Sequence, residues 1–152
     1  MKLGVPMEPD GETRVAIAPS SMKKLLKAGF EVLVETSAGK ASNNLDADYE
    51  AAGAKLVSRK EVLECDTIIS IRFPGVDGVA KGSRVACVAD PFRNPHHVQA
   101  CIDAGITLLS MDMIPRRLSR AQSMDVNSSQ DNLAGYKAVL LGAAHVPKGI
   151  PM

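Results

Sequence analysis

Short apolar runs alternate with amphipathic segments along most of the chain, and glycines close several of the amphipathic segments. Gly29 precedes a valine-rich run over 30–35, and a continuous, largely apolar run occupies 67–71. A run of this kind is expected for a strand that is buried on both faces. Strands that alternate with helices favour a parallel sheet covered by helices on both sides. The alternation therefore predicts an α/β fold with a doubly wound parallel sheet of roughly six strands.

The predicted elements follow one another with short connections and without a long linker or a low-complexity segment. The predicted strands are 3–5, 30–35, 54–57, 67–71, 84–89 and 106–110. The predicted helices are 19–28, 46–52, 58–63 and 94–104, followed by a last helix that begins at Ser128. Ser58 and Glu61 have the spacing of a capping box, and Asn94-Pro95 is a good helix start. Crossovers between parallel strands are expected to be right-handed.

Size and composition suit one compact domain over residues 1–152, of the flavodoxin-like or Rossmann-like kind. Hydrophobic residues make up 45% of the chain but aromatic residues only 3%, so the core must be aliphatic. A net charge of +1 and the scarcity of aromatic rings give no support for a nucleic-acid partner. The cysteines are odd in number and lack CxxC spacing, which favours buried free thiols. We expect no signal peptide and no membrane-spanning segment.

A polar, donor-rich stretch over 115–128 is the strongest candidate for a binding site. Arg116, Arg117 and Arg120 offer planar forks to carboxylate or phosphate groups. The carboxamide of Gln122 can donate and accept, whereas Asp125 only accepts. Such a set can orient a ligand that bears an amide, but charge runs are more often solvated surface, and Asp125 can simply pair with a local arginine.

The segment after this loop has the pattern of a helix. Ser128 can cap it, and Leu133, Tyr136 and Leu140 form an apolar stripe at helical spacing. We therefore expect a surface loop that is held at one end by a docked helix, a common place for binding groups.

The stretch PRRLSRAQSMDVNSSQDNLAGYK over 115–137 resembles a loop in the NAD(H)-binding component of proton-translocating nicotinamide nucleotide transhydrogenase. In that family an Arg-Gln-Asp set arranges the nicotinamide of NAD(H) against that of NADP(H). The resemblance implies that Gln122 and Asp125 are the family's glutamine and aspartate, with Ser128 near the carboxamide. One extra residue before Leu118 leaves Arg116 and Arg117 as rivals for the family's arginine. The implied cofactor-binding residues are Arg116, Arg117, Arg120, Gln122, Asp125 and Ser128, of which Arg116, Gln122 and Asp125 would act in catalysis.

The resemblance also sets expectations for cofactors, partners and location. The segment KLGVPMEPDGETRVAIAP over 2–19 is similar to the family's opening, so the match extends over essentially the whole chain. The sequence contains no G-x-G-x-x-G, the main sign of a dinucleotide site, and in the family that motif lies in a second domain. We therefore expect NAD(H) to need that second domain, and NADP(H) to bind a partner component. The family also implies a homodimer, a membrane component, and a location at the cytoplasmic or matrix side of a membrane.

Two alternative functions stay open. The opening is also similar to that of alanine dehydrogenase, whose substrate site would correspond to Arg14 and Arg72. That family has a lysine where Arg72 stands and a histidine that the strand end at 88–91 lacks, which weakens this alternative because arginine stays charged. The other alternative is a non-catalytic, truncated flavodoxin-like module.

The remaining polar candidates are weaker, and no metal site is expected. His96 and His97 are neighbours that would point about 100° apart on a helix, which favours an exposed pair without partners. His145 stands alone, where a surface or docking role is favoured over metal binding. Ser123 lacks the G-x-S-x-G signature of a nucleophile. Asp10, Glu12 and Arg14 are compatible with a site or with a solvated turn.

Overall fold

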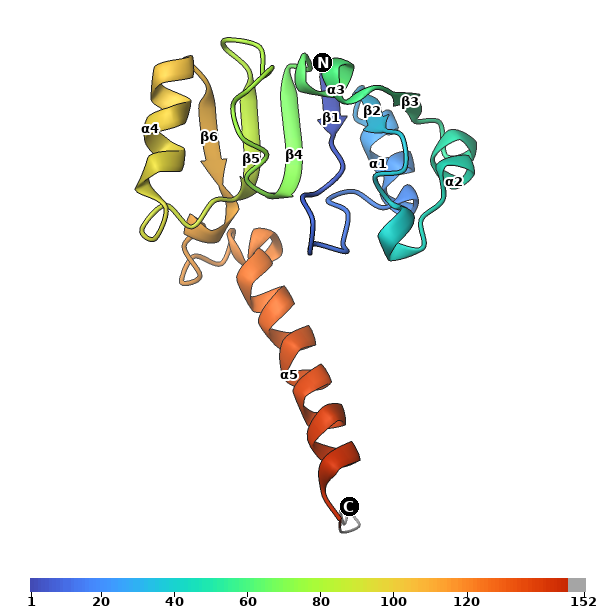
Figure 1. Ribbon diagram of the computed structural model, residues 1–152, viewed down its shortest axis with the longest axis vertical. Helices are drawn as coiled ribbons and strands as arrows, with labels where there is room; N and C mark the ends of the chain where they lie inside the picture. Colours follow the sequence, from blue (N-terminus) through green and yellow to red (C-terminus); the bar gives the residue numbers. More distant parts are fainter. Residues whose placement is uncertain (148–152) are drawn as a thin grey trace. The chain divides into compact units, whose positions relative to one another are not determined.

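The computed structural model describes residues 1–147 and divides into two compact units at Met111 and Asp112 (Figure 1). The prediction of one domain over 1–152 stays a prediction. The first unit contains β1 (Lys2–Val5), α1 (Met22–Lys27), β2 (Glu31–Glu35), α2 (Asp46–Ala51), β3 (Lys55–Val57), α3 (Arg59–Leu63), β4 (Thr67–Arg72), β5 (Arg84–Val88), α4 (Pro95–Ala104) and β6 (Thr107–Ser110). The second contains the long helix α5 (Val126–His145).

The six strands form one parallel sheet in the order β3-β2-β1-β4-β5-β6, side by side in Figure 1. The predicted α/β fold with a doubly wound sheet is therefore confirmed. The direction of strand order reverses between β1 and β4. In open sheets of this kind, ligands bind outside the carboxyl ends of the strands at such a reversal. This topology indicates that the segments following β1 and β4 are candidate ligand-binding positions.

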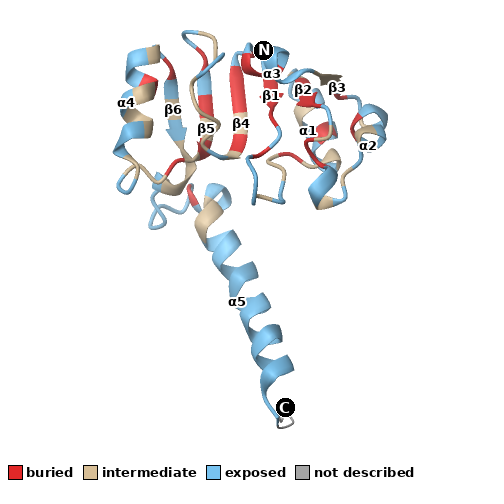
Figure 2. Cartoon of the chain, viewed as in Figure 1, coloured by how far each residue is buried: buried red, intermediate tan, exposed pale blue. Residues whose placement is uncertain are grey.

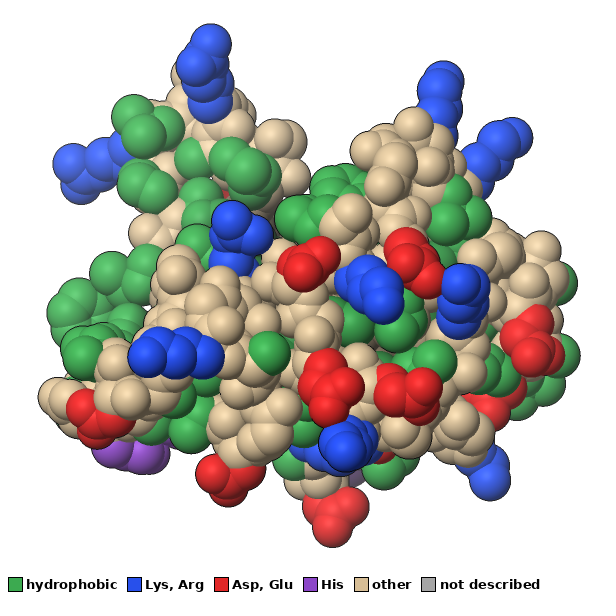
Figure 3. All heavy atoms as spheres, turned by 90° about the horizontal axis from the view of Figure 1, so that it is seen from above, with side chains coloured by type: hydrophobic (Ala, Val, Ile, Leu, Met, Phe, Trp, Pro, Cys, Tyr) green, Lys and Arg blue, Asp and Glu red, His purple; other side chains and the backbone are tan. Residues whose placement is uncertain are grey.

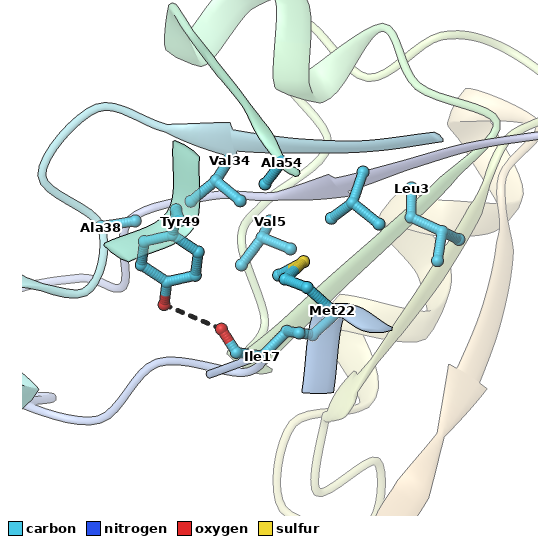
Figure 4. Close-up of a cluster of buried hydrophobic side chains, with 9 residues drawn as sticks. Leu3, Val5, Ile17, Met22, Val34, Ala38, Tyr49 and Ala54 are labelled. Carbon is cyan, nitrogen blue, oxygen red and sulfur yellow. Dashed lines mark hydrogen bonds between the residues drawn. The ribbon is translucent and has the colours of Figure 1, made fainter. Parts of the chain in front are cut away.

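Two apolar clusters stabilise the first unit, and strands β1, β2, β4 and β5 each contribute buried residues (Figure 2). One cluster surrounds Val5 and Val34, where Met22 and Tyr49 are fully buried (Figure 4). The Tyr49 hydroxyl donates a hydrogen bond of 2.8 Å to the carbonyl of Ile17, and burial raises its pKa to about 12. One aromatic side chain thus contributes to a core that is otherwise mostly aliphatic, as the composition predicts.

The second cluster lies along β4, β5 and β6, where Ile68 and Val85 are fully buried. Cys65, Cys87 and Cys101 are buried and free, which confirms the expectation for the thiols. On the face shown in Figure 3, acidic and basic side chains are interspersed. None of the helices within residues 1–147 is long and apolar enough to cross a bilayer.

Gly4 shows how closely a helix approaches the sheet. A Cβ atom at this position of β1 would lie 2.4 Å from the carbonyl oxygen of Val62 in α3, and real Cβ atoms essentially never come so near. The glycine therefore permits close packing of backbone on backbone, at the cost that glycine normally brings to a strand interior.

The start of α5 differs from the prediction. The helix begins at Val126 and its N-cap is Asp125, whose carboxylate accepts a hydrogen bond from the Ser128 amide at 2.9 Å. Ser128 is thus the third residue of the helix rather than its cap. A charged carboxylate is a stronger acceptor than a hydroxyl for the unpaired amides of a first turn, which explains the earlier start.

The prediction of a docked helix is wrong for the described chain. No residue of α5 is buried, and Leu133, Tyr136 and Leu140 are 58%, 67% and 48% exposed (Figure 2). An apolar stripe identifies the face that a helix can bury but does not supply the surface that would cover it.

Candidate functional site

The loop before α5 is closed on itself by contacts to the first two turns of the helix. The side-chain amide of Asn127 donates to the carbonyl of Asp112 at 3.1 Å. Arg116 Nη2 lies 3.2 Å from Asp131 Oδ2, and Arg116 Nε lies 3.9 Å from Asp125 Oδ2. A short 3-10 turn over Gln122–Met124 leads into the helix cap. These contacts hold the ends of the loop together, and between them residues 117–124 are exposed except for the buried Ala121.

Asp125 is the centre of the contacts at the helix start. Its Oδ1 accepts from the Ser128 amide at 2.9 Å, and its Oδ2 accepts from the Ser128 hydroxyl at 2.6 Å. These bonds, with a smaller contribution from the positive charge of Arg116, hold the pKa of Asp125 below its ordinary value. At neutral pH the group is a carboxylate that accepts hydrogen bonds. The structure thus brings together three of the predicted site residues, namely Arg116, Asp125 and Ser128.

Three other predicted site residues lie at the exposed tip. The side chains of Arg117, Arg120 and Gln122 make no ion pair or hydrogen bond within residues 1–147. Gln122 is nevertheless positioned by its backbone, because its carbonyl accepts from the Asp125 amide at 3.4 Å. The carboxamide of Gln122 and the two guanidinium groups are consequently available to a ligand or a partner, in the same loop as the ordered Asp125 carboxylate.

A sequence model of the alanine dehydrogenase/PNT N-terminal domain matches residues 4–134, which include the whole of this loop. The chain belongs to this family. Over its full length it is 40% identical to an NAD(P) transhydrogenase subunit alpha polypeptide of Rhodospirillum rubrum, of which it covers 42%. It is 36% identical to NAD(P) transhydrogenase subunit alpha of Cereibacter sphaeroides, with 92% of this chain and 28% of the relative covered. The chain thus spans less than half the length of these relatives.

Solved structures of family members agree with the fold. The crystal structure of transhydrogenase from Sinorhizobium meliloti superposes with a TM-score of 0.94 at 39% identity, over 100% of this chain and 47% of that one. An L-alanine dehydrogenase superposes with a TM-score of 0.73 at 27% identity, over 80% of this chain and 34% of that one. These similarities confirm the family inferred from the loop motif and from the opening segment. These relatives are named as transhydrogenases and an alanine dehydrogenase, and the alanine dehydrogenase is the more distant of them.

A second polar cluster lies in the first unit, where the sequence left a site and a solvated turn equally open. Glu12 accepts from Arg14 Nε and Arg14 Nη2, both at 2.7 Å, and from Arg72 Nε at 3.2 Å. The Glu12 side chain is only 8% exposed, although the other residues of the segment 9–14 are exposed, so the segment is a surface turn that is anchored through Glu12. The post-β1 segment and the end of β4 meet here, at the reversal of strand order. The two arginines proposed for an alanine-dehydrogenase-like site are thus together but already share one carboxylate.

Glu8 anchors the same segment, and its role was not predicted from the sequence. Ile69 of β4 pairs with Ala86 of β5, and Arg72 pairs with Val88. Between these two pairs β4 has one residue more than β5, so β4 contains a β-bulge. A bulge leaves amides without ladder partners. The two oxygens of Glu8 accept from the amides of Ile71 at 2.6 Å and Arg72 at 2.9 Å. The buried carboxyl group of Glu8 therefore supplies the acceptors that the irregular end of β4 lacks. No sequence pattern indicates this contact.

The histidines differ partly from the expectation of an exposed pair without partners. His97 is half-buried, its Nδ1 lies 3.2 Å from the carbonyl of Ala89, and its ring stacks on Phe73 with centroids 4.3 Å apart. His96 is exposed and meets His97 edge-on. The helix start at Pro95 places His97 against the strand ends, where a carbonyl fixes its ring. Within the described residues, no three histidine, cysteine or acidic side chains group as metal ligands.

The protonation of Glu12 gives a testable pH dependence. Its hydrogen bonds with Arg14 lower the pKa of Glu12 to about 2. A carboxyl whose pKa is lower in the folded than in the unfolded state adds stability above its ordinary pKa of about 4.3, and this is lost as pH falls towards the folded value. Wild type should therefore exceed Glu12→Gln in free energy of unfolding above about pH 5, with the gap closing towards about pH 2. Urea unfolding across this range tests the expectation, and a constant gap would contradict it.

Proposed function

We propose that this chain is the first segment of the NAD(H)-binding component of a proton-translocating nicotinamide nucleotide transhydrogenase. The observation that carries the proposal is the loop, where the exposed side chains of Gln122, Arg117 and Arg120 belong to the same segment as the ordered Asp125 carboxylate. These groups fit a nicotinamide, whose carboxamide needs both a donor and an acceptor. The 40% identity to a transhydrogenase subunit over the full length of the chain supports the same function.

In this proposal the residues of the chain orient the cofactor and need not transfer protons. The nicotinamides supply the hydride chemistry when they are bound. Gln122 hydrogen-bonds the carboxamide and fixes the rotation of the ring, while an arginine contributes a fixed positive charge. Asp125, ordered by Ser128, offers an acceptor. Catalysis then comes from distance and angle, since a hydride passes only between carbons that are held close together.

The proposal also specifies partners. NAD(H) would bind with the remaining segment of the longer subunit, and NADP(H) on a separate component next to a membrane component. A homodimer at the cytoplasmic or matrix side of the membrane is included in the proposed assembly. A direct test is a chimera in which this chain replaces the aligned 42% of the Rhodospirillum rubrum subunit. With the NADP(H)-binding component, the chimera should transfer hydride from NADPH to an NAD analogue. An inactive chimera that folds and binds NADH would overturn the proposal.

One observation favours the alternative of an alanine-dehydrogenase-like substrate site, and one speaks against it. Arg14 and Arg72 do lie together at the reversal of strand order. The carboxylate that they would bind in a substrate is, however, already supplied by Glu12. We therefore expect no oxidation of alanine by the chimera, and turnover with alanine would favour the alternative.

NADH should bind only weakly to the chain by itself. The sequence has no G-x-G-x-x-G turn, so a helix start that could hold the pyrophosphate is not provided in the usual way. Isothermal titration of the chain with NADH should give a Kd weaker than micromolar, and the chimera should bind more tightly. A micromolar or tighter Kd for the chain alone would contradict this prediction.

A further inference from the structure

Two adjacent arginines of the loop have different surroundings. Arg116 and Arg117 occupy the central positions of a turn that closes with the Leu118 amide donating to the Pro115 carbonyl at 3.3 Å. Arg116 makes side-chain contacts with Asp125 and Asp131. Arg117 is exposed and has no ion-pair or hydrogen-bond partner for its side chain within residues 1–147. The guanidinium of Arg116 thus contacts the helix, whereas that of Arg117 can bind a ligand.

The contact with Asp131 spans the whole loop. Arg116 stands before the 3-10 turn and Asp131 stands in the second turn of α5, 15 residues later in the chain, and Nη2 and Oδ2 are 3.2 Å apart. Nε of the same guanidinium lies 3.9 Å from the helix cap, Asp125. A planar fork that faces two carboxylates fixes the start of the loop relative to the axis of the helix. Asn127 provides the other tie, to the carbonyl of Asp112.

We propose that Arg116 and Asp131 form a positioning pair that sets the place of Gln122, and that Arg117 is the arginine facing the cofactor. This inference rests on the proposed function. Without the pair, the segment 117–124 keeps the Asp125 cap at its far end and the buried side chain of Ala121, and it loses the side-chain contact that joins its start to the helix. The carboxamide of Gln122 then samples a wider range of positions. Because Arg116 and Asp131 do not touch the cofactor, their loss affects geometry, whereas the loss of Arg117 affects binding.

The first arm of the test uses the chain alone and needs no activity. Amide hydrogen exchange of residues 118–124 is compared among wild type, Arg116→Gln, Asp131→Asn and Arg117→Gln. An exposed ion pair contributes about 0.2–1 kcal/mol, so Arg116→Gln and Asp131→Asn should each accelerate exchange up to about fivefold. Arg117→Gln is the matched control and should leave exchange unchanged. Equal exchange in all four proteins, or acceleration only in Arg117→Gln, overturns the positioning pair.

A pH titration by NMR measures the pKa of Asp125 in the same proteins and is a second, independent test. Loss of the positive charge of Arg116 should raise the pKa of Asp125, while Arg117→Gln should not change it. A shift of the opposite sign, or the same shift in both variants, contradicts the assignment of Arg116 to the helix cap.

The second arm uses the chimera and separates binding from transfer. Arg116→Gln and Asp131→Asn should slow hydride transfer while NADH affinity stays the same, and Arg116→Lys should restore some of the rate. Arg117→Gln should weaken NADH binding instead. If both arginine variants lose only affinity, the division of roles is wrong. An inactive wild-type chimera would overturn the proposed function, whereas the exchange arm would still decide whether the pair holds the loop.

Discussion

Gln122→Asn in the active chimera is expected to slow hydride transfer by about 100-fold, since a misplacement near 1 Å can cost this much. Asparagine keeps the carboxamide but shortens the side chain by one methylene, so its hydrogen-bonding atoms no longer reach the same point. Losing one neutral hydrogen bond would cost only about 0.5–1.5 kcal/mol in binding, roughly tenfold or less in affinity. The geometric effect should therefore exceed the effect on binding.

Stopped-flow transfer and equilibrium NADH binding, measured on the same variant, give the two quantities. Gln99→Asn in α4 is a suitable control, because it shortens another exposed carboxamide outside the loop. Thermal stability should be unaffected in Gln122→Asn, since the side chain is exposed. If the rate is unchanged, or falls only in proportion to affinity, then Gln122 does not orient the cofactor.

Glu8→Ala is expected to destabilise the chain by about 1–3 kcal/mol, because the part-buried amides of Ile71 and Arg72 lose the acceptor that they share. Glu8 is 8% exposed and accepts from the amides of Ile71 and Arg72 at the bulge of β4. Alanine offers no replacement acceptor, and the post-β1 segment loses its attachment to β4. For a chain of this size, each kcal/mol corresponds to about 2–4 °C in Tm.

The sign of the pH effect at Glu8 is opposite to that at Glu12. Burial raises the pKa of Glu8, and its hydrogen bonds to the two amides only partly offset this. An acid whose pKa is higher in the folded state favours folding at low pH and loses this contribution as pH rises through the folded value. Urea unfolding of wild type, Glu8→Ala and the control Asp10→Ala tests the prediction, since Asp10 is an exposed acid in the same segment. Equal stability of the two variants would show that the Glu8 bonds contribute little.

The sequence by itself determined the sheet and the family. The apolar run at 67–71 and the valine-rich run at 30–35 became β4 and β2, because a strand buried on both faces must be apolar along its length. The capping box of Ser58 and Glu61 formed as predicted, since its bonds are local and depend on spacing alone. The loop motif likewise identified a family that the comparisons confirm.

Tertiary structure decided which polar groups meet. Ser128 has the right residue type for a cap, but Asp125 takes that place three residues earlier, where its charged carboxylate accepts from the Ser128 amide in the first turn of the helix. Glu8 reaches amides at Ile71 and Arg72, far away in the chain, at the irregular end of β4. Local spacing contains no information about such contacts.

Arg116 and Arg117 show most clearly that local spacing does not determine side-chain partners. Arg116 and Arg117 are chemically identical neighbours, and the sequence could not distinguish them. Their difference arises from a turn that directs one guanidinium to Asp131, 15 residues away, and leaves the other in solvent. Long-range pairing depends on where the folded backbone places each side chain. Residue type and spacing therefore predicted the elements and the kind of chemistry, whereas the position of each charge in the fold decided its partners.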